Sequence, residues 1–337
     1  MMWRVPGTAS RLAGRRVLVT GAGGFIGSHV VEALLREGAR VRAFVRYDSR
    51  GSRGWLDAIP STALADVEIV AGDVRDGPTV DRAVDGCEIV MHLAALIAIP
   101  YSYLAPEAYV ATNIVGTQHM LDACRRHDVA RVVHTSTSEV YGTAQQIPID
   151  ESHPLHPQSP YAASKASADL LALSYHASFG TPVVVLRPFN TYGPRQSLRA
   201  IIPTIAAQLI AGGPVRIGAT APTRDFTYVT DTADGFLRAA TADAVGQVVQ
   251  LGTGSEISIG DLAQAIAEVV GAPLRLEADA GRLRPAASEV LRLVSNASRA
   301  HELLGWSPTI SLTDGLRRTA EWLRSDTSLG RAREYVR

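Results

Sequence analysis

The sequence predicts an α/β protein in which helices cover both faces of a doubly wound parallel sheet. Three observations lead to this fold class. Short runs rich in valine and isoleucine alternate with amphipathic helical segments through the first half of the chain. These runs lack the apolar and polar alternation of a half-exposed strand, as expected when both faces are buried. A glycine-rich loop directly follows the first run and opens the first helix, which is typical of a Rossmann sheet.

Strands and helices are expected to alternate regularly in this first half. The expected strands are Arg16–Thr20, Val41–Val45, Val67–Ala71, Ile89–Leu93, Val132–Ser136 and Val183–Leu186. The expected helices are Ile26–Glu37, Thr79–Val84, Ala108–His127 and Tyr161–Phe179. Because each helix crosses back between parallel strands, the carboxyl ends of the strands should share one edge, where ligands bind.

After Arg187, prolines divide the chain into shorter pieces. Strands near Phe226–Val229 and Val248–Leu251 are expected to return to the sheet. The remaining pieces should form a small C-terminal lobe over the carboxyl edge of the sheet, with a ligand cleft between the two. Helices in this second part of the chain are expected near Ile201–Ala211, Asp231–Ala240, Ile259–Val270, Ser298–Leu304 and Leu312–Arg324.

The expected domain organisation follows from these elements. A dinucleotide-binding Rossmann domain should span residues 14–188, with returning segments at about 225–255. Residues 189–224 and 256–330 should form the substrate-binding lobe. Residues 1–13 are expected to be a flexible extension, since they lack the apolar core of a secretory signal.

Composition excludes several classes of protein. The 337 residues carry a formal net charge of zero without a basic stripe, which argues against nucleic acid as a partner. No apolar run is long enough for a membrane helix. The two cysteines, Cys87 and Cys124, form neither a metal motif nor a close pair, so we expect no metal and a reducing cytoplasm.

The glycine loop is the predicted binding site for the phosphates of a dinucleotide. Gly21 permits the tight turn, Gly24 allows backbone to approach the pyrophosphate, and Gly27 allows helix and strand to pack. The N–H groups at the helix start, including Phe25 and Ile26, would face the phosphates together with the positive end of the helix dipole.

The ends of the next strands predict further cofactor contacts. Arg46 could meet the 2′-phosphate of NADP+, whereas Asp48 could reach the 2′-hydroxyl of NAD+, and both alternatives stay open. Asp73, followed by Val74, suits a cap on the adenine amino group. The remaining expected contacts lie at later strand ends and are Leu93, Ala94, Ala95, Thr135 and Pro188.

Tyr161 and Lys165 form the predicted catalytic pair. Their spacing of four places both side chains on one face of a helix. Lys165 is the only lysine among 33 basic residues, which suggests that arginine is not acceptable at this position. A nearby ammonium stabilises the phenolate. Lowering the phenol pKa by about three units requires roughly 4 kcal/mol of stabilisation of the phenolate relative to the phenol. Tyr161 could then act as a base towards a sugar hydroxyl.

Three further residues after the fifth strand complete the predicted catalytic set. Thr137 can hydrogen-bond the same hydroxyl as Tyr161, while Ser138 and Glu139 follow directly. Simple oxidation of a hydroxyl needs no carboxylate, so Glu139 suggests a second proton transfer.

A family resemblance rests on these motifs together. Over about residues 14–325 the chain resembles extended short-chain dehydrogenases of the NAD-dependent epimerase/dehydratase type, and Ala94–Tyr103 is similar to the 4,6-dehydratase branch of legionaminic acid biosynthesis. The Thr-Ser-Glu triplet resembles that of GDP-mannose 4,6-dehydratase, whereas glucose-type dehydratases have Thr-Asp-Glu, so the acid for the leaving hydroxyl is in doubt at Ser138. The motifs are the glycine loop, the Asp73 turn, Thr137-Ser-Glu-Val-Tyr-Gly142, Tyr161-x-x-x-Lys165, Arg187-Pro-Phe-Asn-x-Tyr-Gly-Pro194 and Arg224-Asp-Phe-x-Tyr-Val229.

The resemblance implies a nucleotide-sugar 4,6-dehydratase with tightly bound NAD(P)+, NAD+ being slightly favoured. Tyr161 would take the C4 hydroxyl proton during hydride transfer, Glu139 would remove the C5 proton, and Glu139 or Ser138 would assist the departure of water from C6. The stored hydride would return to C6 and give a 4-keto-6-deoxy sugar. A homodimer formed through the Tyr161 helix and the helix before the fifth strand is also implied.

Substrate contacts are assigned by the same resemblance. Tyr101 lies in the dehydratase-like stretch, and Asn190, Arg195 and Arg224 are expected at the substrate diphosphate, because an arginine fork binds two phosphate oxygens. Arg284 is expected near the nucleotide. Arg224 could instead pair with Asp225, and Arg284 could simply be a surface residue.

Three other functions stay open from the sequence. A nucleotide-sugar 4-epimerase would need Tyr161 and Lys165 but not Glu139, and a uronic acid decarboxylase also carries Thr-Ser-Glu. A non-catalytic nucleotide-sensing module could dispense with both Tyr161 and Lys165, which this chain retains.

Overall fold

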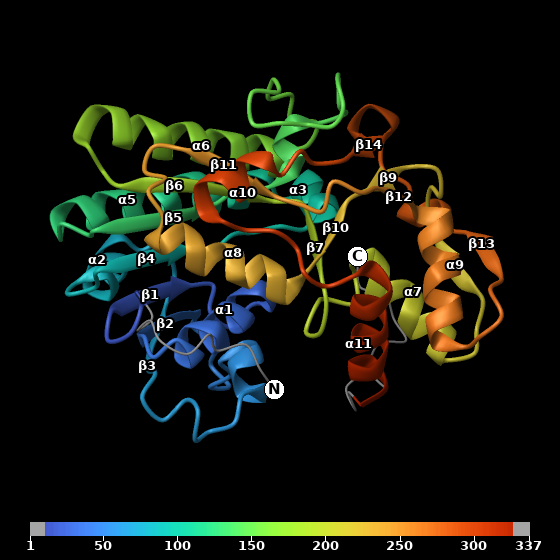
Figure 1. Cartoon of the computed structure of the whole chain (residues 1–337), viewed down its shortest axis with the longest axis horizontal. Coiled ribbons are helices and arrows are strands. Elements are labelled where there is room, and N and C mark those ends of the chain that lie inside the picture. Colours follow the sequence, from blue (N-terminus) through green and yellow to red (C-terminus); the bar gives the residue numbers. More distant parts are fainter. Residues whose placement is uncertain (1–10, 326–337) are drawn as a thin grey trace.

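A computed structural model describes residues 11–325 and contains a seven-stranded parallel sheet in the order β11-β6-β5-β4-β1-β2-β3 (Figure 1). β1 pairs with β2 on one side and with β4 on the other, so the strand order reverses at β1. A reversal of this kind opens a ligand crevice at the carboxyl ends of the strands. The strands are β1 (Arg16–Thr20), β2 (Arg40–Arg46), β3 (Glu68–Gly72), β4 (Ile89–His92), β5 (Arg131–Thr135), β6 (Val183–Pro188) and β11 (Val248–Leu251).

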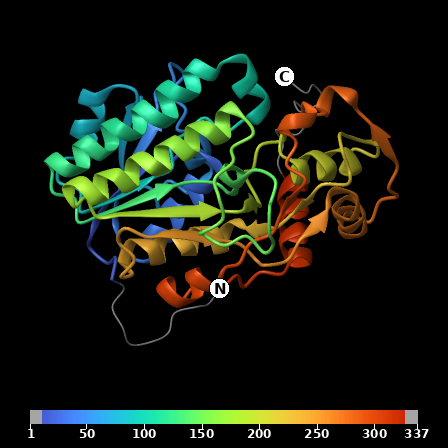
Figure 2. The ribbon, with the colours of Figure 1, turned by 90° about the horizontal axis from the view of Figure 1, so that it is seen from above.

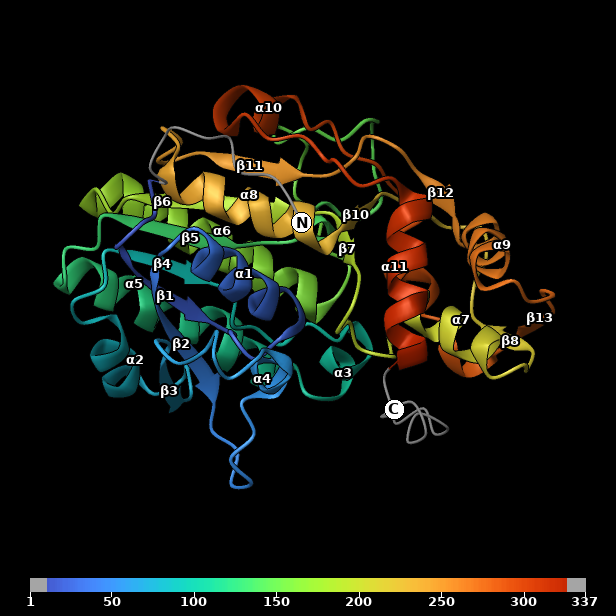
Figure 3. The same cartoon turned by 60° about the horizontal axis from the view of Figure 1, so that its bottom comes forward.

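Helices cover both faces of the sheet (Figure 3). α1 (Phe25–Arg36) and α8 (Val229–Thr241) pack together on one face over valine and leucine side chains of the strands. α2 (Gly77–Val84), α5 (Gly116–Arg126) and α6 (Pro160–Phe179) cover the other face. The doubly wound parallel sheet predicted from the sequence is therefore confirmed.

The long helix expected over Ala108–His127 is divided in the structure. α4 (Pro106–Tyr109) and a π-helical turn (Val110–Val115) precede α5, and α3 (Ile99–Leu104) was not expected. Pro100 and Pro106 each stand in a first turn, where a missing N–H costs nothing. These short elements bring the segment after β4 against α6.

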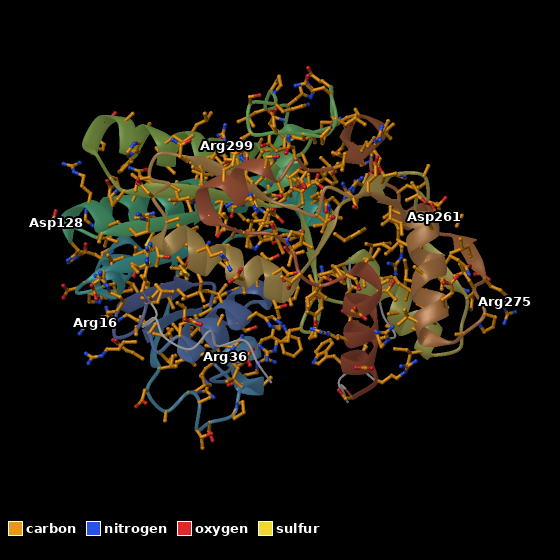
Figure 4. All side chains as sticks on the ribbon, in the orientation of Figure 1. Arg16, Arg36, Asp128, Asp261, Arg275 and Arg299 are labelled. Carbon is orange, nitrogen blue, oxygen red and sulfur yellow. The ribbon has the colours of Figure 1, made fainter. Side chains whose placement is uncertain are left out.

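The C-terminal lobe is a separate layer of helices and short strands beside the carboxyl ends of the sheet (Figure 2). In Figure 4, Arg16 and Asp128 mark the far end of the sheet, whereas Asp261 and Arg275 lie on the lobe. The lobe contains α7 (Ile201–Ile210), α9 (Ile259–Val270) and α11 (Leu312–Ser325), the pair β8 (Val215–Ile217) and β13 (Leu276–Ala278), and a three-stranded sheet of β12 (Ile257–Ser258), β9 (Thr223–Arg224) and β14 (Arg292–Leu293). α10 (Ser298–Leu304) packs back on β11.

One of the two strands expected to return to the sheet does not. β11 pairs with β6 as predicted, but β10 (Phe226–Tyr228) pairs with β7 (Asn190–Tyr192) in a separate two-stranded sheet. The free edge of β6 is already occupied by β11, so β10 follows the chain beyond the end of β6 instead. This small sheet connects the two parts of the molecule. No helix within residues 11–325 is long and apolar enough to cross a membrane.

Candidate active site

The glycine loop between β1 and α1 is built for close backbone approach. Gly21 has a φ of +67°, and a Cβ placed there would lie 2.9 Å from the backbone nitrogen of Ala94. A Cβ on Gly27 would lie 2.1 Å from the carbonyl oxygen of Gly21. Larger residues would therefore push β1, α1 and the segment after β4 apart, which explains the glycines predicted at these positions.

The start of α1 leaves backbone donors available for an anion. Gly24 is the residue that precedes the helix, and no side chain caps its first turn. The N–H groups of Phe25, Ile26 and Gly27 consequently lack partners within the helix, and the positive end of the helix dipole lies beside them. These residues fit the pyrophosphate of a dinucleotide.

Thr20 fixes the segment after β4 beside this loop. Its hydroxyl accepts from the backbone nitrogens of Leu93 and Ala94, each at 3.1 Å, and pairs with Nδ1 of His92 at 2.9 Å. Nε2 of His92 lies 3.2 Å from the hydroxyl of Thr117. His92 is therefore a packed residue at the end of its strand, and Leu93 and Ala94 border the glycine loop.

At the carboxyl ends of β2 and β3, both candidate acids are engaged by arginines. Asp73 accepts from the Arg75 guanidinium at 2.6 Å, and Asp48 accepts from Arg50 at 3.2 Å. Each arginine holds the pKa of its aspartate below the usual range. Arg46, at the end of β2, has an exposed side chain.

The predicted catalytic pair lies on the first turns of α6, which faces the carboxyl end of β5. Ser159 accepts from the backbone nitrogen of Ala162 at 3.1 Å and so fixes the start of the helix. Lys165 donates to the carbonyl oxygen of Thr135, and Tyr161 is hydrogen-bonded to Thr137. The structure thus brings together Thr135, Thr137, Tyr161 and Lys165.

Burial acts against the lowered phenol pKa expected from Lys165 and a bound nicotinamide ring. Burial raises the pKa of Tyr161, an effect that outweighs the hydrogen bond from Thr137, and the negative charge of Glu139 raises it further. Burial also lowers the pKa of Lys165 to about 8, while Asp169 raises it. The phenol is therefore protonated in this environment, because desolvation disfavours the charged forms of both groups.

Asp169 is a buried residue that the sequence reasoning missed. It lies one helical turn beyond Lys165 and is fully buried. Its carboxylate accepts from the Ser136 hydroxyl and from the Arg187 guanidinium at 3.0 and 3.1 Å, and it lies 3.3 Å from His134. The i, i+4 spacing from Lys165 was the signal that could have revealed it.

Ser138 and Glu139 occupy a short 3₁₀ turn (Ser138–Tyr141) after β5. The Thr137 hydroxyl accepts from the Glu139 backbone nitrogen at 3.3 Å and caps this turn. The Glu139 side chain is only 12% exposed and lies 3.9 Å from Arg284 of the C-terminal lobe. Ser138 is buried. A carboxylate therefore stands beside Tyr161, where the lobe meets the sheet.

Two arginines of the lobe form a loosely paired cluster around this carboxylate. Arg224 lies 3.6 Å from Glu289, and Arg284 lies 4.0 Å from the same residue. Nη1 of Arg284 is buried without a hydrogen bond among the described residues. Burial lowers the pKa of Arg224, and the positive charge of Arg284 lowers it as well. The cluster thus places two guanidiniums beside two carboxylates at long ion-pair distances, with one buried donor atom of Arg284 left without a hydrogen bond inside the described part of the chain.

The alternative pairing of Arg224 with Asp225 is not observed. Asp225 is fully buried and accepts instead from Thr253, Gly254 and Ser295. Arg284 is only 28% exposed and lies 3.9 Å from Glu139, so it is not an open surface residue.

Arg195 does not fit its predicted role at the substrate diphosphate. Its guanidinium donates to both carboxylate oxygens of Glu32 on α1, at 2.9 and 3.1 Å, and to Ser28 at 3.2 Å. The φ of Arg195 is +70°, a left-handed conformation that is uncommon for residues other than glycine. Because this fork is already bound to a carboxylate, we remove Arg195 from the substrate set.

The other predicted substrate residues, Asn190 and Tyr101, lie on β7 and α3. Asn190 begins β7 and donates to the carbonyl oxygen of Asp225 at 3.4 Å. The Tyr101 ring lies tilted against Tyr109, with 6.2 Å between ring centroids, and the Tyr109 ring packs edge-on against Tyr161. The sequence reasoning missed Tyr103, whose hydroxyl lies 2.5 Å from Ser288 and links α3 to the lobe.

The fold and this site define a class of enzyme: a Rossmann-type protein with the Tyr-x-x-x-Lys pair of nicotinamide-dependent nucleotide-sugar enzymes. The family model described as GDP-mannose 4,6 dehydratase matches residues 18–319. The chain therefore belongs to this family. Within residues 11–325, no group of three or more His, Cys, Asp or Glu side chains gathers as a metal site.

Comparison with known proteins places both dehydratases and epimerases near this chain. It is 37% identical to a dTDP-glucose 4,6-dehydratase of Actinoplanes sp. over 93% of this chain and 99% of the relative. It is 36% identical to a UDP-glucose 4-epimerase of Mycolicibacterium smegmatis over 92% of this chain and 99% of that one. The structure of a dTDP-glucose 4,6-dehydratase from Streptomyces venezuelae with NAD and TYD bound is 33% identical, with a TM-score of 0.84, over 93% of this chain and 98% of that one.

Proposed function

We propose that the chain is a nucleotide-sugar 4,6-dehydratase that converts an NDP-hexose or NDP-N-acetylhexosamine into a 4-keto-6-deoxy sugar and water. One observation carries this proposal: a largely buried carboxylate, Glu139, stands beside the Tyr161 phenol, close enough to raise its pKa. Oxidation at C4 needs a single base, whereas elimination across C5 and C6 needs a second proton transfer. An additional carboxylate at this point meets that need.

In the first step, Tyr161 takes the proton of the C4 hydroxyl. Thr137, already hydrogen-bonded to the phenol, holds the same hydroxyl, and Lys165 supplies positive charge from the next helical turn. When bound, the nicotinamide cofactor would accept the C4 hydride and later return it to C6. Its positive ring would oppose the burial that raises the pKa of Tyr161.

In the second step, Glu139 removes the C5 proton, which the new C4 ketone has made more acidic. The hydroxyl at C6 then leaves as water, with its proton supplied by Glu139 or through Ser138. Ser138 cannot itself replace a carboxylic acid, so Glu139 carries both of these proton transfers. When the hydride returns to C6, C5 takes up a proton from solvent by way of Glu139, and Tyr161 releases to solvent the proton that it took from the C4 hydroxyl.

The lobe arginines are proposed to bind the substrate diphosphate. Arg284 contacts Glu139 and Glu289 only at 3.9 and 4.0 Å, and its buried Nη1 lacks a hydrogen bond within residues 11–325. Diphosphate oxygens would satisfy this donor and draw Arg284 from Glu139. Binding of the nucleotide would thereby free the carboxylate for proton transfer.

Product mass tests the proposal directly. The purified protein is incubated with a panel of UDP-, GDP- and dTDP-sugars, and the masses of the products are measured by mass spectrometry. A dehydratase removes one water, an epimerase leaves the mass unchanged, and a decarboxylase removes carbon dioxide. A product of unchanged mass with an inverted C4 would contradict dehydration.

Glu139→Gln tests the assigned residue in deuterated water. Oxidation at C4 should persist in this variant, whereas C5 deuterium exchange should fall by about 10²–10⁴-fold, the usual contribution of a general base. Glu107→Gln, a change on exposed α4, is the control. Unchanged C5 exchange in Glu139→Gln would remove this residue from the mechanism.

Epimerisation at C4 is the second candidate function. Ser138 stands where glucose-type dehydratases have an acid, and a UDP-glucose 4-epimerase is among the similar proteins at 36% identity. The same mass measurement separates the two functions.

We further propose that two copies pair through α5 and α6. Leu170 and Phe179 on α6 are 60% and 53% exposed, so this helix leaves apolar side chains that a partner helix could cover. Sedimentation of the wild type as a dimer, and of Leu170→Glu as a monomer, is the expected result.

A further inference from the structure

The helix that follows the glycine loop packs against the C-terminal lobe as well as against the sheet. Phe25 and Ile26, the first two residues of α1, contact the hydrophobic core of the lobe, which includes Ile205, Leu262 and Leu316. Ile26 also packs against the core that α1 and α8 form over the sheet. These two residues supply backbone N–H groups that fit a pyrophosphate. The packing of the lobe therefore helps to fix the start of α1.

A polar connection joins the next turn of α1 to the loop that leads into the lobe. Nε2 of His29 lies 3.1 Å from the carbonyl oxygen of Pro194. The ion pair between Arg195 and Glu32 lies beside it, with 2.9 Å between the charged atoms and both side chains largely buried. The first two turns of α1 are thus attached to the lobe by apolar and polar contacts in succession.

An aromatic contact attaches the glycine loop itself to the lobe. Trp55 donates its backbone N–H to the carbonyl oxygen of Gly23 at 2.8 Å. A Cβ on Gly23 would lie 2.4 Å from the carbonyl oxygen of Arg53, so the segment around the 3₁₀ turn Gly54–Ala58 lies directly on the loop. The Trp55 ring meets Trp322 of α11 edge-to-face, with 5.5 Å between centroids and 73° between ring planes. α11 is the lobe helix that stands nearest the sheet in Figures 1 and 3.

We propose that Trp55 and Trp322 form an aromatic clasp between the glycine loop and the lobe, and that this clasp slows the release of a bound dinucleotide. The inference rests on the proposed function, because a dinucleotide must lie in the glycine loop. Both tryptophans are positioning residues, since they act through the backbone of Gly23. The loop cannot move away from the lobe while the two rings stay in contact.

The proposed reaction gives this clasp a purpose. The hydride taken from C4 must return to C6 of the same sugar, so the dinucleotide has to stay bound between the two transfers. Release after the first transfer would leave an oxidised sugar that the protein could no longer reduce. An attachment that couples the glycine loop to the lobe therefore protects the cycle from interruption.

The test measures how fast the full-length protein releases its dinucleotide. Protein is loaded with NAD+ or, in a parallel sample, with NADP+, and is then desalted. It is diluted into an excess of the same dinucleotide labelled with deuterium, and samples are desalted again after increasing times. Mass spectrometry of the dinucleotide that remains bound gives the release rate without any measurement of turnover.

Two single variants and their combination test the contact between the rings. Trp55→Ala and Trp322→Ala should each speed release by about tenfold, the upper range for the loss of one edge-to-face aromatic pair. The double variant should be no faster than either single variant, because each ring acts through the other. Trp322→Phe keeps an aromatic ring and should stay within about threefold of wild type.

The controls address folding and general effects on the lobe. Leu276→Ala shortens a 44% exposed side chain on β13 of the lobe and should leave release unchanged. Trp322 packs against the lobe core, so circular dichroism verifies that its variants are folded. Trp55→Ala lies on the other side of the contact and tests the clasp even if Trp322→Ala does not fold.

The outcomes separate this inference from the proposed function. Unchanged release in Trp55→Ala overturns the clasp and leaves the enzyme proposal intact. Faster release with additive effects in the double variant also overturns it, because the rings would then act separately. Failure of the wild type to retain either dinucleotide overturns both proposals, since the glycine loop would hold no cofactor.

Discussion

The two sides of the cleft are built in opposite ways. On the sheet side, Asp169 is fully buried and hydrogen-bonded to Ser136 and Arg187, one helical turn from Lys165. On the lobe side, Arg224 and Arg284 face their glutamates only at 3.6 to 4.0 Å. The groups that perform chemistry are thus held in position before substrate binds. The arginines that would bind the diphosphate meet their glutamates only at long ion-pair distances and could form closer contacts with phosphate oxygens.

Because of this difference, the loss of a partner on the sheet side should lower the free energy of unfolding. A substitution of a lobe arginine should weaken substrate binding alone. Removal of one member of a buried ion pair leaves an uncompensated charge. Removal of an arginine that is only loosely paired leaves a smaller uncompensated charge. The following four predictions test this comparison.

The largest effect is expected at the phenol. Tyr161→Phe removes the proposed base and should lower turnover by about 10³-fold or more, within the range of general base catalysis. Tyr175→Phe removes a phenol from the same helix and should leave turnover within about twofold of wild type. Substantial turnover in Tyr161→Phe would contradict the assigned base.

Asp169→Asn should be strongly destabilising. It removes the negative charge between Arg187 and Lys165 in a site without solvent access, so the free energy of unfolding should fall by about 3–5 kcal/mol. Urea unfolding measures this change, and Asp66→Asn at an exposed position is the control. A loss below 1 kcal/mol would show that the buried network is not held by charge.

The buried amine should make stability rise with pH. Lys165 has a pKa of about 8 in the folded chain and 10.5 as the model value for the unfolded chain. Below pH 8 both states are protonated and the cost of burying the charge is fully present; above pH 10.5 both are neutral and the cost is gone. Relative to Lys165→Met, wild-type stability should therefore rise by up to about 3 kcal/mol between these values. A flat difference in urea unfolding would contradict the lowered pKa.

The smallest effect on stability is expected in the lobe. Arg284→Ala should raise the KM for the nucleotide sugar by about 10- to 100-fold, as expected for a lost charged hydrogen bond, and leave unfolding nearly unchanged. Arg275→Ala, on the exposed surface of the lobe in Figure 4, should change neither quantity. A large loss of stability in Arg284→Ala would remove the contrast between the two sides.

Much of the sheet side was predictable from local sequence. The glycine loop lies at one strand–helix junction, and Tyr161 and Lys165 lie on consecutive turns of one helix. Residue spacing alone therefore fixes their geometry. The position of Asp169, four residues beyond Lys165 on the same helix, could also be predicted from spacing. Its partners His134 and Arg187 could not, because they lie on two separate strands. Their convergence depends on the pairing of β5 with β6.

The expectations that failed depended on contacts between distant segments. Arg195 was assigned to substrate by its motif, yet Glu32 on α1 binds its guanidinium. β10 pairs with β7 because β11 occupies the edge beside β6. Likewise, spacing did not show the burial around Tyr161, which raises the phenol pKa and acts against the lowering expected from Lys165 and the nicotinamide ring.

The sequence by itself determined the parallel sheet, the glycine loop and the tyrosine–lysine pair, since each follows from spacing within one element or between two adjacent ones. Only the tertiary structure decided that Arg284 meets Glu139 and that Arg50 and Arg75 neutralise the acids beside Arg46. Side-chain partners and burial depend on which segments fold against each other, and residue spacing does not encode that.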